Sequence, residues 1–227
     1  MSRRIDSSRL PSTSRIRLAM VTIGALLFLI FSSSPHLCKA ETAPQVQPYE
    51  AALEYKKLIM ITLTKMPDGV TGMKSTAYIN APPVTVWKVL TDYNNLKRYI
   101  PRMVESDLVG SKGNLKVIDL TGEFRVLLYK KTIRVTVNML EKYPSRIDYE
   151  QISGDFEVYR GSWILQMYSS EGTILTYESE IKPSFAAPDF IFQGILKNDM
   201  AAGLTALKAE SERLQANQLV HADGLQK

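Results

Sequence analysis

Cysteine and histidine are scarce in this chain of 227 residues, which holds one Cys (Cys38) and two His (His36 and His221). Cys38 and His36 fall in a leader that we expect to be removed, and His221 lies in a polar stretch near the C-terminus. A cysteine nucleophile, a zinc site, a Ser-His-Asp triad and a histidine base each need a thiolate or an imidazole in a folded pocket. The sequence therefore predicts no metal site and argues against catalysis of these kinds.

Phosphate-binding glycine loops and a basic surface are also missing. Without a glycine-rich loop between a strand and a helix, we expect no nucleotide cofactor and predict no cofactor at all. The chain has 28 Lys and Arg against 23 Asp and Glu. Residues 1–40 hold six of the basic residues and one of the acidic ones, so 22 of each remain in the body. A neutral body excludes nucleic acid as a partner, because binding to phosphates requires clustered positive charge.

Residues 1–40 have the order of a secretory signal peptide. Residues 1–17 are polar and rich in Arg, residues 18–31 are apolar, and small residues lead to Ala40. Fourteen helical residues span roughly 21 Å, which is short of the bilayer core of about 30 Å. We therefore expect cleavage and export, with a periplasmic location. The alternative is an uncleaved leader that anchors the protein in the inner membrane through residues 18–31.

The remaining chain predicts a single domain. Residues 41–48 contain two prolines and read as a linker, residues 49–216 as the domain, and residues 217–227 as a flexible tail. A chain of this length buries about 70% of its unfolded surface and needs no disulfide.

Hydrophobic periodicity predicts an antiparallel sheet followed by a long helix. Asp68-Gly69 favours a hairpin turn. Pro83 suits the first turn of a helix over residues 84–93, and a second short helix is expected to end before Pro101. The expected strands cover residues 55–65, 70–80, 104–109, 115–120, 124–140, 146–152, 157–168 and 173–181, and the last helix covers residues 188–216. Connections this short cannot hold parallel crossovers, so the expected class is α+β.

Alternation along the last two strands predicts their inner faces. Tyr159, Gly161, Trp163, Leu165 and Met167 share one side of the first strand, and Leu175, Tyr177, Ser179 and Ile181 share one side of the second. The long helix carries an apolar stripe that includes Phe192, Leu196, Met200, Gly203, Leu207 and Leu214. Trp87 is expected in the core. Gly194 and Gly203 indicate either close packing or room for a ligand.

Three groups of residues resemble sequence motifs of one superfamily, and they occur in the order and with the spacing found there. They are Ile79-Asn80-Ala81-Pro82 with Val86 to Tyr93 and Tyr99-Ile100-Pro101, then Gly154-Asp155-Phe156 with Tyr159 to Trp163, then Leu175 to Glu178 with Pro183. The superfamily is the helix-grip group of START-related lipid-transfer, polyketide cyclase/dehydrase and coenzyme Q-binding proteins, and the match covers residues 70–214. The resemblance implies a curved antiparallel sheet wrapped around a long C-terminal helix, with two short helices after the first strands.

The resemblance implies binding or transfer of a hydrophobic small molecule or lipid, in an apolar cavity between sheet and helix. The residues expected to bind it are Tyr159, Trp163, Tyr177, Phe192, Leu196 and Met200. One alternative is an enzyme of the cyclase or dehydratase kind in the same cavity, for which the candidates are Asp155, Arg125, Arg160 and Tyr177. We name no catalytic residue, because Asp155 suits a turn and Arg160 falls on the outer face. Another alternative is a membrane-anchored module that binds a partner protein. A membrane surface is a further expected partner, and the oligomeric state stays open.

Overall fold

The computed structural model describes residues 59–126, 129–168 and 172–224. The chain divides into two units, Met1–Ala43 and Pro44–Lys227, and all described residues belong to the second. The predicted signal peptide at 1–40, its apolar segment at 18–31 and the linker at 41–48 lie outside the described residues. Within the described ranges, no helix is both long enough and apolar enough to cross a bilayer.

Eight strands form one antiparallel sheet, in the order β1-β2-β8-β7-β6-β5-β4-β3. Their bounds are β1 (Ile59–Lys65), β2 (Thr71–Ile79), β3 (Met103–Lys112), β4 (Leu115–Val126), β5 (Tyr129–Lys142), β6 (Arg146–Gly154), β7 (Phe156–Met167) and β8 (Thr173–Pro183). Strands β3 to β7 each pair with the next strand in the chain, and the β1–β2 hairpin joins the sheet along β8. The predicted antiparallel arrangement is confirmed.

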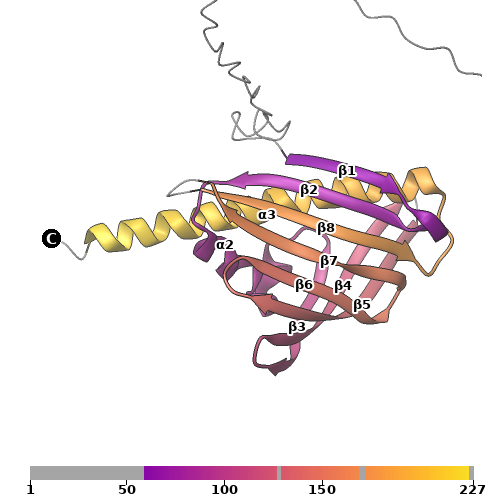
Figure 1. The fold of residues 1–227 in the computed structure, drawn as a ribbon, viewed down its shortest axis with the longest axis horizontal. Coiled ribbons are helices and arrows are strands. Elements are labelled where there is room, and N and C mark those ends of the chain that lie inside the picture. The colour runs from indigo at the N-terminus through magenta and orange to yellow at the C-terminus, as the bar shows by residue number, and fades with distance from the viewer. Residues whose placement is uncertain (1–58, 127–128, 169–171, 225–227) are drawn as a thin grey trace, which may run out of the picture. The chain divides into compact units, whose positions relative to one another are not determined.

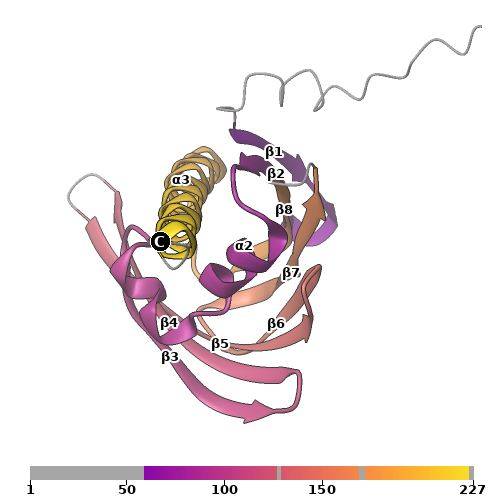
Figure 2. The same cartoon turned by 90° about the vertical axis from the view of Figure 1, so that its left-hand side faces the viewer.

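Besides a short 3-10 helix in the first hairpin, three helices of the described residues complete the domain. The α-helix α2 (Pro83–Leu90) and the 3-10 helix η2 (Tyr93–Arg98) follow β2, and the long helix α3 (Asp189–Gly224) follows β8. The sheet curls around α3 and α2, which lie within its concave side (Figures 1 and 2). This confirms the predicted α+β class and helix-grip architecture.

The first hairpin turn follows from its sequence. The short 3-10 helix η1 (Pro67–Gly69) connects β1 to β2, and Asp68 and Gly69 have φ of 57° and 75°. Asp and Gly are among the residues that adopt this left-handed region most readily. The Asp-Gly pair therefore fixes the turn that brings β1 back against β2.

Two predicted boundaries are wrong. Residues 124–140 were expected to form one strand, but Phe124–Val126 belong to β4, and Val126 pairs with Tyr129 of β5. No Gly, Pro or Asn marks this turn, so the pattern did not reveal it. The last helix was expected to end near Ala216 and leave a flexible tail, but α3 continues to Gly224. Its last turns extend beyond the sheet (Figure 1), and residues 216–221 are exposed. This part of the helix therefore needs no apolar periodicity of the kind that marks a covered helix.

The core lies between the concave face of the sheet and the helices. Its residues include Ile79, Trp87, Leu175 and Leu204, and each is buried. The predicted inner face of β8 is confirmed, because Leu175, Tyr177, Ser179 and Ile181 are all buried. On β7 the prediction fails for Met167, which is 70% exposed because it is the last residue of that strand.

Candidate functional site

An apolar cavity of about 290 Å³ lies between the concave face of the sheet and α3. Strands β4 to β8 supply most of its walls, with aromatic side chains on β7 and β8 and aliphatic ones on β5. The α3 wall consists of Leu196, Asp199, Met200, Gly203 and Leu207. Each of these positions lies three or four residues from another of them, so they share one helix face. The cavity is therefore a product of the same packing that forms the core.

Five of the six predicted ligand-binding residues line this cavity. Tyr159 and Trp163 come from β7, Tyr177 from β8, and Leu196 and Met200 from α3. Phe192 does not line it and instead packs against the buried core, because the cavity ends before the first turn of α3. Ligand binding by the five residues stays a prediction that their position supports.

Gly194 and Gly203 of α3 lie beside open space. A Cβ built at Gly194 or Gly203 would have nothing within 4 Å, so neither glycine is there for close packing. Gly203 lines the cavity directly. Of the two interpretations that the sequence left open, the structure favours the one with space beside the helix.

A cluster of phenols forms one wall of the cavity. The Tyr149 hydroxyl lies 2.5 Å from the Tyr177 hydroxyl and donates to Ser179 Oγ at 2.7 Å. The rings of Tyr149 and Tyr159 lie 5.0 Å apart between centroids, and those of Trp163 and Tyr177 lie 4.4 Å apart. These pairs are within the range of favourable aromatic contacts. The cluster places several hydroxyls against an otherwise apolar space.

Burial keeps these phenols neutral. Desolvation raises the pKa of Tyr149, Tyr159 and Tyr177 above the ordinary value for tyrosine. A tyrosine of ordinary pKa is already protonated at neutral pH, and the lost hydration of a buried phenolate makes removal of the proton harder still. The three hydroxyls can hold a polar group by hydrogen bonds, but they are poorly suited to act as bases.

The cavity reaches the surface beside an ion pair. Arg102, which precedes β3, pairs with Asp199 on α3, and both side chains line the cavity. The Arg102 side chain is 49% exposed. Burial raises the pKa of the Asp199 carboxyl, and the positive charge of Arg102 opposes this rise without cancelling it. Arg102 itself has φ of 64°, an uncommon conformation for a residue with a side chain.

Two of the residues suggested for chemistry, Asp155 and Arg160, lie away from the cavity. The Asp155 carboxylate accepts a hydrogen bond from the Arg134 backbone N–H at 2.8 Å, which serves the turn between β6 and β7. Arg160 points to the outer face and pairs with Glu180. The side chain of Arg125 lies outside the described residues. Among the candidates whose side chains the structure describes, Tyr177 alone lines the cavity.

Sequence reasoning missed several polar residues of the cavity, among them Tyr149, Arg102 and Asp199. Tyr149 could have been found, because it alternates with the buried Ile147 along β6. Arg102 and Asp199 carry no such signal. They meet only because the segment after η2 and the middle of α3 come together in the fold.

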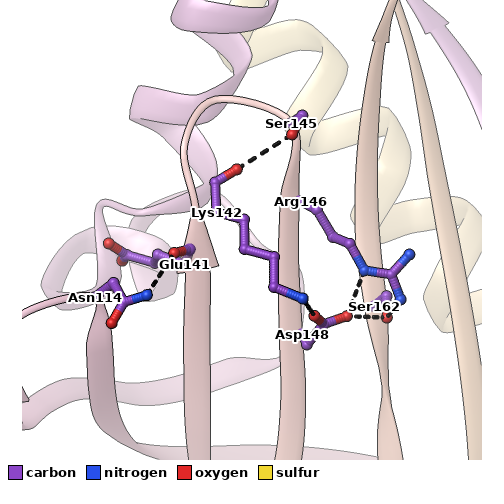
Figure 3. Close-up of polar contacts among 7 residues, drawn as sticks. All are labelled: Asn114, Glu141, Lys142, Ser145, Arg146, Asp148 and Ser162. Carbon is purple, nitrogen blue, oxygen red and sulfur yellow. Dashed lines mark hydrogen bonds and ion pairs between the residues drawn. The ribbon is translucent and has the colours of Figure 1, made fainter.

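A wider hollow of about 710 Å³ lies on the opposite, outer face of the sheet, and paired charges line much of it. The Asp148 carboxylate accepts hydrogen bonds from Lys142 Nζ, Arg146 Nε and Ser162 Oγ, each at 2.6 Å (Figure 3). Burial acts to raise the pKa of Asp148, but these donors outweigh it and hold the pKa at about 2. Lys74 pairs with Glu178 at 2.8 Å nearby. Because these charges satisfy one another, this hollow is the weaker candidate for a ligand site.

Known structures share the fold. The Zhui aromatase/cyclase from a Streptomyces species is 19% identical with a TM-score of 0.56, over 63% of this chain and 94% of that one. A STAR-related lipid transfer protein fragment from Xanthomonas axonopodis is 16% identical with a TM-score of 0.53, over 66% and 98%. A START superfamily protein from Mycobacterium smegmatis is 13% identical with a TM-score of 0.54, over 63% and 98%. At these identities the likeness concerns the fold alone.

The sequence itself identifies the family. No curated protein matches the chain. The family profile described as polyketide cyclase / dehydrase and lipid transport matches residues 79–208, which run from the end of β2 into α3 and include nearly all of the cavity wall. The chain therefore belongs to the polyketide cyclase / dehydrase and lipid transport family.

Proposed function

We propose that the protein binds a hydrophobic small molecule in the cavity between the sheet and α3, and carries or presents it outside the cytoplasm. The observation that carries the proposal is the cavity itself, which is lined mostly by aliphatic and aromatic side chains and reaches the surface at Arg102 and Asp199. Burial of the apolar surface of a ligand would supply most of the affinity. The family description includes lipid transport, and one solved relative is a lipid transfer protein.

The cavity size limits the ligand. The cavity has a volume of about 290 Å³. This is at the small end of ligand pockets, which span about 300 to 1,000 Å³. We therefore infer a ligand with one chain or a small ring system, such as an isoprenoid, rather than a phospholipid with two acyl chains.

The test is to identify what the protein carries. Protein purified from its native host without detergent is extracted with organic solvent, and the extract is analysed by mass spectrometry. We expect one lipophilic species in the wild type and its loss in Met200→Arg, because a guanidinium in the cavity opposes an apolar ligand. Ala202→Arg is the matched control, since Ala202 is exposed on α3 two residues away. An empty wild-type protein, or equal recovery from Met200→Arg, would contradict the proposal.

The extracellular part of the proposal rests on the leader. Its Arg-rich start, apolar middle and small-residue end are typical of a signal peptide. The mass of the mature N-terminus tests it directly. Cleavage after Ala40 supports release, and an intact N-terminus supports an anchor through residues 18–31.

A second candidate function is a cyclase or dehydratase in the same cavity. It is favoured by one observation, namely a carboxyl group of raised pKa, Asp199, that faces the cavity beside Arg102. Such a group is suited to general acid catalysis. Incubating the extracted compound with the protein tests this function. Loss of water or ring formation that disappears in Asp199→Asn would support an enzyme, and an unchanged compound would support binding alone.

A further inference from the structure

The two edges of the sheet are built differently. The strand order leaves β1 at one edge and β3 at the other (Figure 2), so each has one side on which no strand of the described residues pairs. An edge strand turns every second N–H and C=O outward, and these groups attract a strand of another chain unless they are protected. The protection of each edge therefore indicates which of the two can receive a further strand.

The β3 edge is protected in three ways. Its pairing with β4 is interrupted by two register shifts, which disturb the row of outward groups. Helix η2 lies against it, and the Leu108 N–H donates a hydrogen bond to Asn94 Oδ1 at 2.8 Å. The strand also carries charged side chains, namely Glu105, Asp107 and Lys112. Each of these features discourages pairing with another strand.

The β1 edge has little protection of this kind. Its seven residues, Ile59–Lys65, pair with β2 without any register shift, and they include no Pro and no Gly. The one charged residue of the strand is Lys65, at its end, and this charge is paired with Asp189 of α3. A regular, uncharged strand of this length is a template for a further strand.

The sequence of β1 is complementary to a second copy of itself. When two copies run antiparallel about Thr62, all seven residues have a partner. The pairs are Ile59 with Lys65, Met60 with Thr64, Ile61 with Leu63, and Thr62 with Thr62. Apolar residues meet on the core side of the strand, a Thr–Thr pair forms on the outer side, and no two like charges face each other. Such cross-strand pairs stabilise a sheet.

We propose that two copies of the protein pair through β1 and form a dimer with one continuous antiparallel sheet. The same residues make the contact on both copies, so a two-fold axis at Thr62 closes the dimer. One pair of strands is a small interface, and we therefore expect a dimer that dissociates on dilution. The cavity wall contains no residue of β1, so the pairing leaves the cavity available to a ligand.

Charge substitutions at Thr62 test the pairing. The Thr62 side chain is exposed, so the monomer can accept a charge there. Thr62→Lys and Thr62→Glu each place two like charges opposite each other at the two-fold axis, which opposes pairing. Protein purified from its native host is studied by sedimentation velocity over a wide range of concentrations. We expect a dimer of the wild type and a dissociation constant about fivefold higher for each variant.

An equal mixture of the two variants makes the test specific. Mixed dimers bring opposite charges together, so the mixture should dimerise as well as the wild type. Val109→Lys is the matched control, because Val109 is 55% exposed on the opposite edge strand, β3. It should keep the wild-type dissociation constant. Circular dichroism confirms that each variant is folded.

Hydrogen exchange locates the contact. The amides of β1 should become more protected as the concentration rises, while those of β3 stay unchanged. A wild type that is monomeric at every concentration would overturn the proposal, and so would charge variants that dimerise as well as the wild type. Failure of the mixture to recover dimers would overturn the antiparallel pairing about Thr62. Protection of β1 that is independent of concentration would also overturn the proposal, because another part of the same chain would then cover this edge.

Discussion

The hydroxyl of Tyr149 occupies the space that a side chain at Gly161 would need. The two residues are direct cross-strand partners on β6 and β7, and a Cβ at Gly161 would lie 2.8 Å from the Tyr149 oxygen. Because Gly161 has no side chain, Tyr149 reaches across β7 to Ser179 and Tyr177 on β8. The phenol cluster therefore depends on a glycine in the middle of a strand, where glycine is otherwise unfavourable.

Gly161→Ala tests this dependence. The added methyl group would also lie 2.0 Å from the Glu178 carbonyl oxygen, so the β7–β8 pairing must shift. We expect a loss of about 2 to 3 kcal/mol in the free energy of unfolding, the usual cost of overpacking. Gly194→Ala is the opposite case, because its methyl group meets nothing within 4 Å and alanine favours a helix. It should gain about 1 kcal/mol. Urea denaturation of both variants measures these changes in the free energy of unfolding. A Gly161→Ala protein as stable as the wild type would contradict the need for glycine at this position.

Gly203→Leu is predicted to fill the cavity without breaking α3. A substituent at Gly203 points into open space on the cavity wall, and leucine is a better helix former than glycine. The variant should keep or raise its melting temperature while it loses uptake of a lipophilic fluorescent probe. Ala202→Leu, at an exposed position, controls for added apolar surface. Full probe uptake by Gly203→Leu would place the ligand elsewhere.

Asp148→Asn is predicted to lower the free energy of unfolding by an amount that depends on pH. The folded pKa of Asp148 is about 2 against an ordinary value of 3.8. A lowered pKa stabilises the fold above the unfolded value, and this contribution is lost as the pH falls from 3.8 towards 2. After allowance for solvent screening we expect a loss of about 1 kcal/mol at pH 7. The wild type and the variant should become equally stable near pH 2.

Asp119→Asn, at an exposed carboxylate on β4, is the control for Asp148→Asn. Denaturation at a series of pH values measures both variants. A difference between Asp148→Asn and the wild type that stays constant down to pH 2 would contradict the role of the ionised carboxylate.

Asp199→Asn is predicted to change the stability at pH 7 in the opposite direction to Asp148→Asn. The folded pKa of Asp199 is raised above 3.8, because burial outweighs the attraction of Arg102. Its contribution to stability is therefore fully present below pH 3.8 and is lost as the pH rises through the folded pKa. The variant should match the wild type near pH 3 and be the more stable protein at pH 7. Thermal unfolding at the two pH values measures this, and a less stable variant at pH 7 would show that the ion pair with Arg102 dominates.

The order of elements could be predicted because local signals mark it. Asp68-Gly69 fixes a turn, Pro83 begins α2, and alternation identifies the inner residues Tyr159, Trp163 and Tyr177. Prediction fails where the local sequence contains no such signal. The β4–β5 turn has no breaker, and the end of α3 has no apolar face to mark it.

The polar parts of the cavity were harder to predict, since each is made by distant segments. Arg102 and Asp199 are 97 residues apart in the chain and meet only in the folded protein. Tyr149 gains its role from Gly161 and Ser179, which lie on two other strands. A period-two pattern shows which way a residue faces, but it does not show which hydroxyls will touch.

The α3 wall of the cavity comes from a single short stretch of chain, residues 196–207, whereas the opposite wall is spread over β4 to β8. Changes on one side of that helix alter the volume and polarity of the chamber without disturbing a single strand pairing. Proteins with this scaffold can thus differ in cavity volume and polarity through substitutions at a few neighbouring positions. For protein engineering, residues 196–207 can be replaced as one segment. Such a replacement is expected to change which molecules fit the cavity, while the sheet and its phenol cluster stay unchanged.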